Sequence, residues 1–206
     1  KHTVGDRVKH PYEAFDAEDW EAVRRHPIEG AKLIARSTNL NSTTLRCMHV
    51  ALEHHLTGAE GSYPDMGERW RPSLLSRIVQ IADAYVSLQS HRSERGATVT
   101  PYQALGMMLG PLQGLFDPAM LWALVQTVGF YPPGQLVEMD DGSIAAVLSP
   151  NPADLARPHV RILRDPWGEW LGDNATELKP IPSDRSVARP LAASEYPGDP
   201  GVPRAA

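Results

Sequence analysis

The stretch LLSRIVQIADAYVSLQS, residues 74–90, governs how the rest of the sequence is interpreted. Its apolar side chains recur at helical intervals, at Leu74, Ile78, Ile81, Ala82 and Tyr85. This spacing predicts one long helix with an apolar face. Asp83 interrupts the apolar run, and burying an unpaired carboxylate is costly, so it should be ion-paired, hydrogen-bonded or bound to a metal. The plain alternative is a helix-surface Asp83 that pairs with Arg77 or another basic residue.

Helical patterns flank this stretch on both sides. Asp16 looks like an N-terminal cap, and a helix that starts there should give way at Gly30 to a second one reaching Ala35. Further helices are expected over 45–56, 100–108 and 117–128, with an irregular, Gly- and Pro-rich segment over 58–72. Residues 1–130 are therefore predicted to form a mainly α domain, a helical bundle.

The period of the pattern changes after residue 130. Residues 135–139 and 144–148 are short strand-like runs joined by Asp140-Asp141-Gly142, a hairpin signal, and 160–164 is a third strand candidate. We expect a small β subdomain over 131–178. From Lys179 the sequence is rich in Pro, Ser, Arg and Ala without periodicity, which predicts a disordered tail over 179–206.

Composition narrows the class of protein. The chain has 206 residues, 42% of them hydrophobic, and a net charge of −5, which argues against bulk nucleic-acid binding because such proteins present a basic face. No apolar run approaches the roughly 18 residues that a membrane-spanning helix needs. One cysteine, Cys47, excludes an internal disulfide and fits a reducing compartment. We therefore expect a cytoplasmic location.

Four side chains suited to a divalent metal recur along the helical part. His26 stands in His26-Pro27-Ile28-Glu29-Gly30; the pair His54-His55 begins 28 positions after His26, and Asp83 follows 28 positions after His55. Taken singly, a histidine is more often a surface residue than a ligand. These four fall on three separate predicted helices, however, and facing helices of a bundle commonly build metal sites from inward-pointing side chains.

The order of these motifs resembles the HD-GYP phosphohydrolases. The likeness runs through most of residues 1–170, and the segments that carry it are His26–Gly30, His54-His55, Gly61–Pro64, Ser76–Tyr85, Ser90–Arg92, Phe116–Pro118 and the β segment from Tyr131 to Pro158. The resemblance implies an HD-type helical bundle and a metal-dependent phosphodiesterase. In this family two or three ions, usually iron or manganese, cleave the bacterial messenger cyclic di-GMP with a metal-activated water.

The resemblance also implies roles for particular residues. His26, His54, His55 and Asp83 would be metal ligands. Tyr63 and Pro64 would belong to the loop that flanks the substrate, and Arg92 and Arg95 would hold its phosphate, although a solvated turn is an equally plain reading of that segment. Lys1 would stabilise the developing charge as a catalytic residue.

Several positions depart from the family pattern. The His-Asp doublet that defines the family is absent. In the family a lysine follows this doublet closely, and Lys1 stands at the position expected for that lysine. We therefore expect this chain to be a fragment whose N-terminal part is missing. Leu56, Ser62 and Val86 replace an acid, a glycine and a second aspartate. Two functions stay open: a phosphodiesterase, or a catalytically degenerate HD-type signalling and interaction module. The resemblance further implies fusion to or pairing with a sensory domain, and the long helices leave room for a homodimer.

Overall fold

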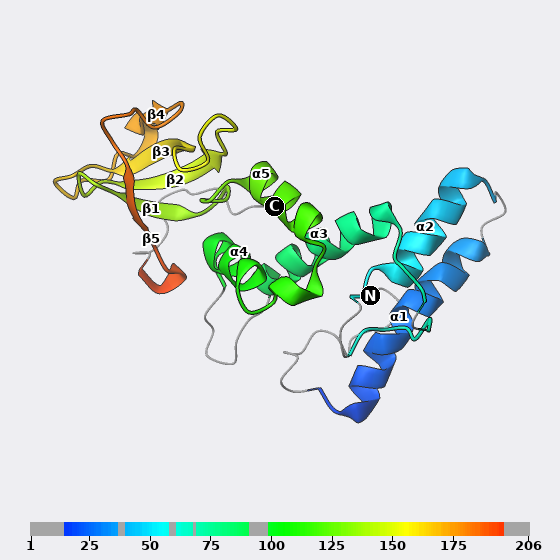
Figure 1. Cartoon of the computed structure of the whole chain (residues 1–206). Coiled ribbons are helices and arrows are strands. Elements are labelled where there is room, and N and C mark those ends of the chain that lie inside the picture. Colours follow the sequence, from blue (N-terminus) through cyan, green and yellow to red (C-terminus); the bar gives the residue numbers. More distant parts are fainter. Residues whose placement is uncertain (1–14, 37–39, 58–60, 68, 91–98, 196–206) are drawn as a thin grey trace.

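The computed structural model describes residues 15–36, 40–57, 61–67, 69–90 and 99–195, and it combines helices with one antiparallel sheet (Figure 1). The helices come first along the chain: α1 (Ala17–Ala35), α2 (Ser42–Glu53), α3 (Leu74–Ser90), α4 (Pro101–Leu109) and α5 (Pro118–Val128). The strands follow: β1 (Leu136–Met139), β2 (Ile144–Ser149), β3 (His159–Arg164), β4 (Glu177–Leu178) and β5 (Val187–Pro190). The expected succession of a helical part and a small β part is confirmed.

Helix α1 is one continuous helix where the sequence predicted two. Asp16 caps it with a reciprocal capping box to Asp19, as expected. Pro27 lies inside the helix, and Gly30 does not end it. A proline inside a helix removes one backbone hydrogen bond, here the one that would reach the carbonyl of Val23. That loss is compensated by a side chain, described below.

Helix α2 begins and ends earlier than predicted. Asn41 caps its start by accepting a hydrogen bond from the Thr44 amide at 2.9 Å. The helix ends at Glu53, so His54 is its C-cap and His55 follows it. The two histidines therefore lie at a helix terminus, where the backbone turns away, and not on the side of a helix as the sequence suggested. Helices α1 and α2 pack side by side (Figure 1).

Helix α3 packs against α4 and α5 around a small apolar core. Ile81, Met108, Phe116 and Leu121 are its buried members. Asp117 joins two of these helices: its Oδ1 caps α5 by accepting from the Ala119 amide at 2.9 Å, and its Oδ2 accepts from Arg77 of α3 at 2.5 Å. A hydrogen bond from the Met120 amide, together with those from Arg77 and the Ala119 amide, lowers the pKa of Asp117. One carboxylate thus fixes how α5 meets α3.

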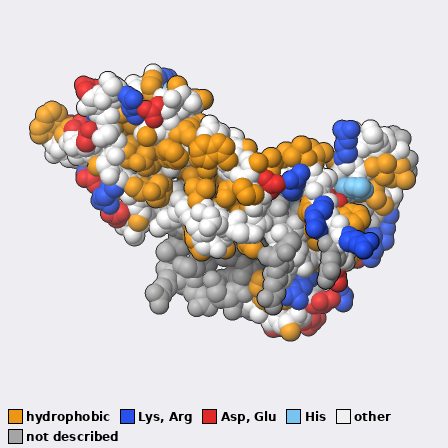
Figure 2. Space-filling view, viewed as in Figure 1, with side chains coloured by type: hydrophobic (Ala, Val, Ile, Leu, Met, Phe, Trp, Pro, Cys, Tyr) orange, Lys and Arg blue, Asp and Glu red, His pale blue; other side chains and the backbone are white. Residues whose placement is uncertain are grey.

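Part of α3 stays uncovered by the described residues. Leu74, Leu75, Ile78, Val79 and Val86 are exposed, and so is Trp122 of α5. Hydrophobic side chains are prominent over this part of the surface in Figure 2. The described helices therefore form less than a closed bundle. None of them is both long enough and apolar enough to cross a membrane.

The sheet has the strand order β4-β3-β2-β1-β5, with every pair antiparallel. The predicted strands match β1, β2 and β3 to within a residue, and the predicted hairpin turn joins β1 to β2, with Gly142 at a φ of 83°. One face buries an apolar cluster: Val137, Met139, Ala145, Val147, Val160, Ile162 and Ile181. The short strand-like runs and the Asp140–Gly142 turn signal made these strands visible in the sequence.

Residues 179–195 differ from the expected disordered tail. Strand β5 pairs with β1 at the edge of the sheet, and Ile181 is only 1% exposed inside the apolar cluster. Asp140, in the β1–β2 turn, accepts hydrogen bonds from the amide and hydroxyl of Ser186. The Pro- and Ser-rich composition led to a wrong prediction of disorder for this segment, which completes the sheet. Residues 196–206 lie outside the described part of the chain.

If residues 179–195 belong to the folded sheet, then Ile181→Ala should lower the free energy of unfolding by about 2–5 kcal/mol, because it leaves a cavity in the core. Urea unfolding followed by circular dichroism measures this change. Leu148→Ala on β2 is the control: it removes as many carbons from a side chain that is 38% exposed and should cost clearly less. Equal losses from both substitutions would contradict the packing of this segment.

Candidate metal centre

His26 lies inside α1 with its ring held in one orientation. The residue is 5% exposed, and its Nδ1 donates a hydrogen bond to the Val23 carbonyl at 2.6 Å. This is the carbonyl that Pro27 leaves without a backbone donor. The proline thus frees an acceptor, and the neighbouring histidine occupies it. Since Nδ1 carries the proton, Nε2 presents a bare lone pair.

His54 is held in the same way at the end of α2. Its Nδ1 donates to the Ala51 carbonyl at 2.9 Å, with the Val50 carbonyl 3.2 Å away. Carbonyls in the last turn of a helix lack the backbone donors that a longer helix would provide, so a side chain can use them. His54 therefore also turns an unprotonated Nε2 outward.

The two Nε2 atoms meet 3.0 Å apart. With both Nδ1 atoms protonated and engaged, two neutral rings would place one lone pair against another. An added proton or a cation between them removes that repulsion. Burial lowers the pKa of His54, with the charge of Asp83 acting in the opposite direction, so burial works against the proton. Two nitrogens bound at about 2.1 Å and at right angles to one ion lie about 3.0 Å apart, so the spacing fits a shared metal.

His55 completes a cluster of three. The candidate ligand atoms of His26, His54 and His55 all lie within 4.8 Å of one another. The ring of Tyr63 stacks on His55 with their centroids 4.6 Å apart, and the Tyr63 amide donates to the His55 carbonyl at 3.4 Å. Ser62 supports the same loop, because its Oγ accepts from the Thr57 amide at 3.1 Å. The 61–64 loop thus folds against the histidines.

Asp83 stands beside this cluster rather than within it. Among the described residues, the group of converging ligand atoms contains the three histidines and no carboxylate. Asp83 lines a cavity of about 700 Å³ together with His54 and residues of α2 and α3. Its charge also acts on the His54 ring. Of the four residues proposed from the sequence, three come together and the fourth faces the same region.

The remaining sequence-based candidates divide into two groups. Tyr63 contacts the cluster, whereas its neighbour Pro64 lines a separate cavity with Thr57 and Gln80. Lys1, Arg92 and Arg95 lie outside the described residues, so their proposed roles stay predictions.

Glu53 is a site residue that the sequence analysis missed. It is 3% exposed and accepts hydrogen bonds from Ser76 Oγ at 2.6 Å, the Ser73 amide at 2.9 Å and Trp70 Nε1 at 3.1 Å. Burial alone would raise the pKa of Glu53, but these donors outweigh it and hold the pKa below its ordinary value of 4.5. The carboxylate anchors the end of α2, which carries His54 and His55, to the start of α3.

Comparison with known proteins gives one informative similarity. The chain is 30% identical over 141 residues to a protein of Pseudomonas aeruginosa named cyclic di-GMP phosphodiesterase PA4108. The alignment covers 68% of this chain and 33% of that protein, so the chain spans about a third of its relative's length. No protein-family model and no solved structure matches the chain. The similarity supports a distant family-level link to this phosphodiesterase.

Replacing Glu53 should weaken the protein in a pH-dependent way. We expect Glu53→Gln to lower the free energy of unfolding at pH 7 by about 1.5–3 kcal/mol, since charge-assisted hydrogen bonds to a buried carboxylate are lost. The native advantage is present above pH 4.5 and should shrink as the pH falls, because the folded protein holds this carboxylate ionised with a lowered pKa. Urea denaturation at a series of pH values measures both effects.

Glu21→Gln is the matched control. Glu21 forms an exposed ion pair with Arg25 one helical turn away on α1, and such pairs contribute little to stability. A Glu53→Gln protein that matched Glu21→Gln at every pH would contradict an anchoring role for Glu53.

Proposed function

We propose that the chain carries the metal-binding part of an HD-GYP-type phosphohydrolase that acts on a cyclic dinucleotide or a related phosphodiester. The observation that carries the proposal is the approach of His26 Nε2 and His54 Nε2 to 3.0 Å while the Nδ1 of each ring is engaged with a backbone carbonyl. The similarity to a named cyclic di-GMP phosphodiesterase supports the phosphodiesterase class. His26, His54 and His55 would hold the metal, with Asp83 as a fourth ligand.

The roles of the protein's own residues follow from their contacts. Val23 and Ala51 carbonyls keep the His26 and His54 rings in the tautomer that can bind a metal. Tyr63 packs on His55 and covers one side of the cluster. Two or three bound divalent ions, iron or manganese in our proposal, would activate a water and neutralise charge on the phosphodiester. Arg92, Arg95 and Lys1 would contact the substrate phosphate.

The proposal predicts that the purified chain binds divalent metal through these histidines. Adding Mn²⁺ or Fe²⁺ under anaerobic conditions, followed by desalting and elemental analysis, should give bound metal in the native chain. His54→Ala should reduce the metal affinity at least about tenfold, because a ligand is lost. His49→Ala is the control: His49 is an exposed histidine on the same helix and should leave metal binding unchanged.

The outcomes separate the two candidate functions. Absence of bound metal in the native chain, or equal metal content in both variants, would overturn the metal centre. Metal binding together with hydrolysis of cyclic di-GMP would support the phosphodiesterase. Metal binding without hydrolysis of cyclic di-GMP or of bis(p-nitrophenyl) phosphate would favour the catalytically degenerate signalling module for this chain.

A further inference from the structure

Trp167 is a large apolar side chain that the fold holds out in solvent. It is 89% exposed, and its neighbours Pro166, Gly168 and Glu169 are exposed as well. A tryptophan that became buried would remove roughly 150–250 Å² of surface from water. Exposure alone carries little meaning, because single apolar residues are common on protein surfaces. The conformation of the turn that holds this side chain is more informative.

The turn over residues 165–169 is fixed by its own hydrogen bonds. Asp165 Oδ1 accepts from the Trp167 amide at 3.0 Å and from the Glu169 amide at 2.8 Å. The Asp165 carbonyl accepts from the Gly168 amide at 3.1 Å, and the Asp165 amide donates to the Glu169 carbonyl at 2.9 Å. Gly168 has a φ of 94°, which glycine adopts without strain. A turn that is already ordered loses little conformational entropy on binding, so it presents Trp167 as an anchor for a partner.

An apolar groove lies between α2 and α3. It is the cavity of about 700 Å³ that His54 and Asp83 line, and its other lining residues are Thr43, Arg46, Cys47, Val50, Ala51, Leu75, Ile78 and Val79. The α3 side chains Leu75, Ile78 and Val79 are exposed, so the groove is open to solvent. Its volume lies within the range of roughly 300–1,000 Å³ that binding pockets for small molecules span, so it has room for an indole ring.

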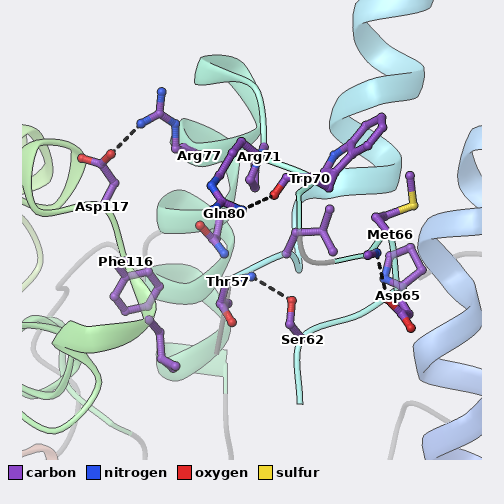
Figure 3. A pocket seen from close by; sticks show the side chains of 15 residues that line it. Thr57, Ser62, Asp65, Met66, Trp70, Arg71, Arg77, Gln80, Phe116 and Asp117 are labelled. Atoms are coloured by element: carbon purple, nitrogen blue, oxygen red, sulfur yellow. Dashed lines mark hydrogen bonds and ion pairs between the residues drawn. The ribbon is translucent and has the colours of Figure 1, made fainter. Parts of the chain in front are cut away.

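A second cavity, of about 860 Å³ beside the 62–67 loop, offers a more polar surface (Figure 3). Figure 3 shows Arg77 paired with Asp117 on one side of it and Asp65 on another, and Arg71 also lines it. An entering indole would desolvate these charged groups without giving them new partners, which is costly. The groove between α2 and α3 is therefore the better match for an apolar anchor.

The exposed charges of the turn and of the groove are opposite in sign. Arg46 is exposed on α2, whereas Asp83 is half-buried and acts on the His54 ring, so Arg46 is the exposed charge of the groove. Glu169 is exposed beside Trp167. Neither Arg46 nor Glu169 has an ion-pair partner within the described part of the chain. Opposite charges beside an apolar contact favour one orientation of docking.

We propose that the 165–169 turn of one chain docks in the α2–α3 groove of a second copy, with Trp167 in the groove and Glu169 beside Arg46. The sheet lies at one end of the molecule and α1 and α2 lie at the other, so the turn does not reach the groove of its own chain (Figure 1). Two antiparallel copies would exchange turns about a two-fold axis, which makes the contact twice and closes the assembly as a dimer. The inference is independent of the proposed function, because it needs neither metal nor substrate.

Sedimentation velocity of the full chain over a concentration series tests the assignment, in buffer containing EDTA so that metal plays no part. The native chain should form dimers. Trp167→Ala should raise the dimer dissociation constant at least about tenfold, because the aromatic anchor is lost. Trp122→Ala is the matched control: it removes the same ring from an exposed position on α5 outside the groove and should leave the constant unchanged. A native chain that stays monomeric throughout the series, or equal effects of the two substitutions, would overturn the proposal.

A second pair of variants tests the groove. Ile78→Asp places a carboxylate among apolar side chains of the groove and should weaken dimerisation as much as Trp167→Ala does. Val86→Asp is its control, since Val86 is an exposed residue of the same helix outside the lining. Because Trp167→Ala keeps the groove and Ile78→Asp keeps the turn, a mixture of the two should form dimers at concentrations where each alone is monomeric. A mixture that stays monomeric would contradict docking of the turn in the groove.

Charge reversal tests the orientation of the docked turn. Arg46→Glu should weaken dimerisation several-fold, because it sets two carboxylates against each other. Adding Glu169→Arg to the same chain should recover the lost affinity, since the proposed pair is restored with its signs exchanged. Absence of this recovery would overturn the pairing of Glu169 with Arg46. None of these results depends on metal binding or hydrolysis, so this proposal and the proposed function fail separately.

Discussion

The hydrogen bond from His26 to the Val23 carbonyl is the contact on which the candidate site depends. A proline in mid-helix normally costs stability because it strands a carbonyl. Here the stranded carbonyl fixes the tautomer of the preceding histidine, and α1 continues through Pro27 without a break. The His26-Pro27 sequence thus orients the Nε2 atom of His26. His54 reaches the same result through a carbonyl freed by the end of α2.

Placing the second histidine requires a buried anchor as well. Glu53 ends α2 and accepts hydrogen bonds from residues that begin α3, among them Ser73 and Ser76. The hydrogen bonds outweigh the cost of burying its charge. The end of α2 is therefore fixed against α3 immediately before the two histidines. A buried carboxylate thus sets the position of the groups proposed to bind metal.

Much of the architecture was visible in the sequence because it rests on local rules. The Asp16 cap, the proline at the first turn of α5 and the Asp140–Gly142 turn each act over a few residues. The parts that were missed depend on distant partners. Strand β5 forms by pairing with the edge of β1. The paired residues Glu138 and Arg189 lie 51 positions apart in the sequence. Glu53 likewise gains its role from serines 20 and 23 residues later.

Helix α3 contributes to an apolar core and to two cavities, so its apolar stretch determines several features of the structure. Its Ile81 side enters the core with Met108 and Phe116. Arg77 and Gln80 line one cavity, whereas Leu75, Val79 and Asp83 line the other with His54. A helix that contributes to one core and to two cavities requires polar residues at intervals within an apolar run, and the sequence shows this pattern. Asp83 and Gln80 interrupt that run in different surroundings: Asp83 lines a cavity together with His54, and Gln80 is 7% exposed beside the cavity next to the 62–67 loop.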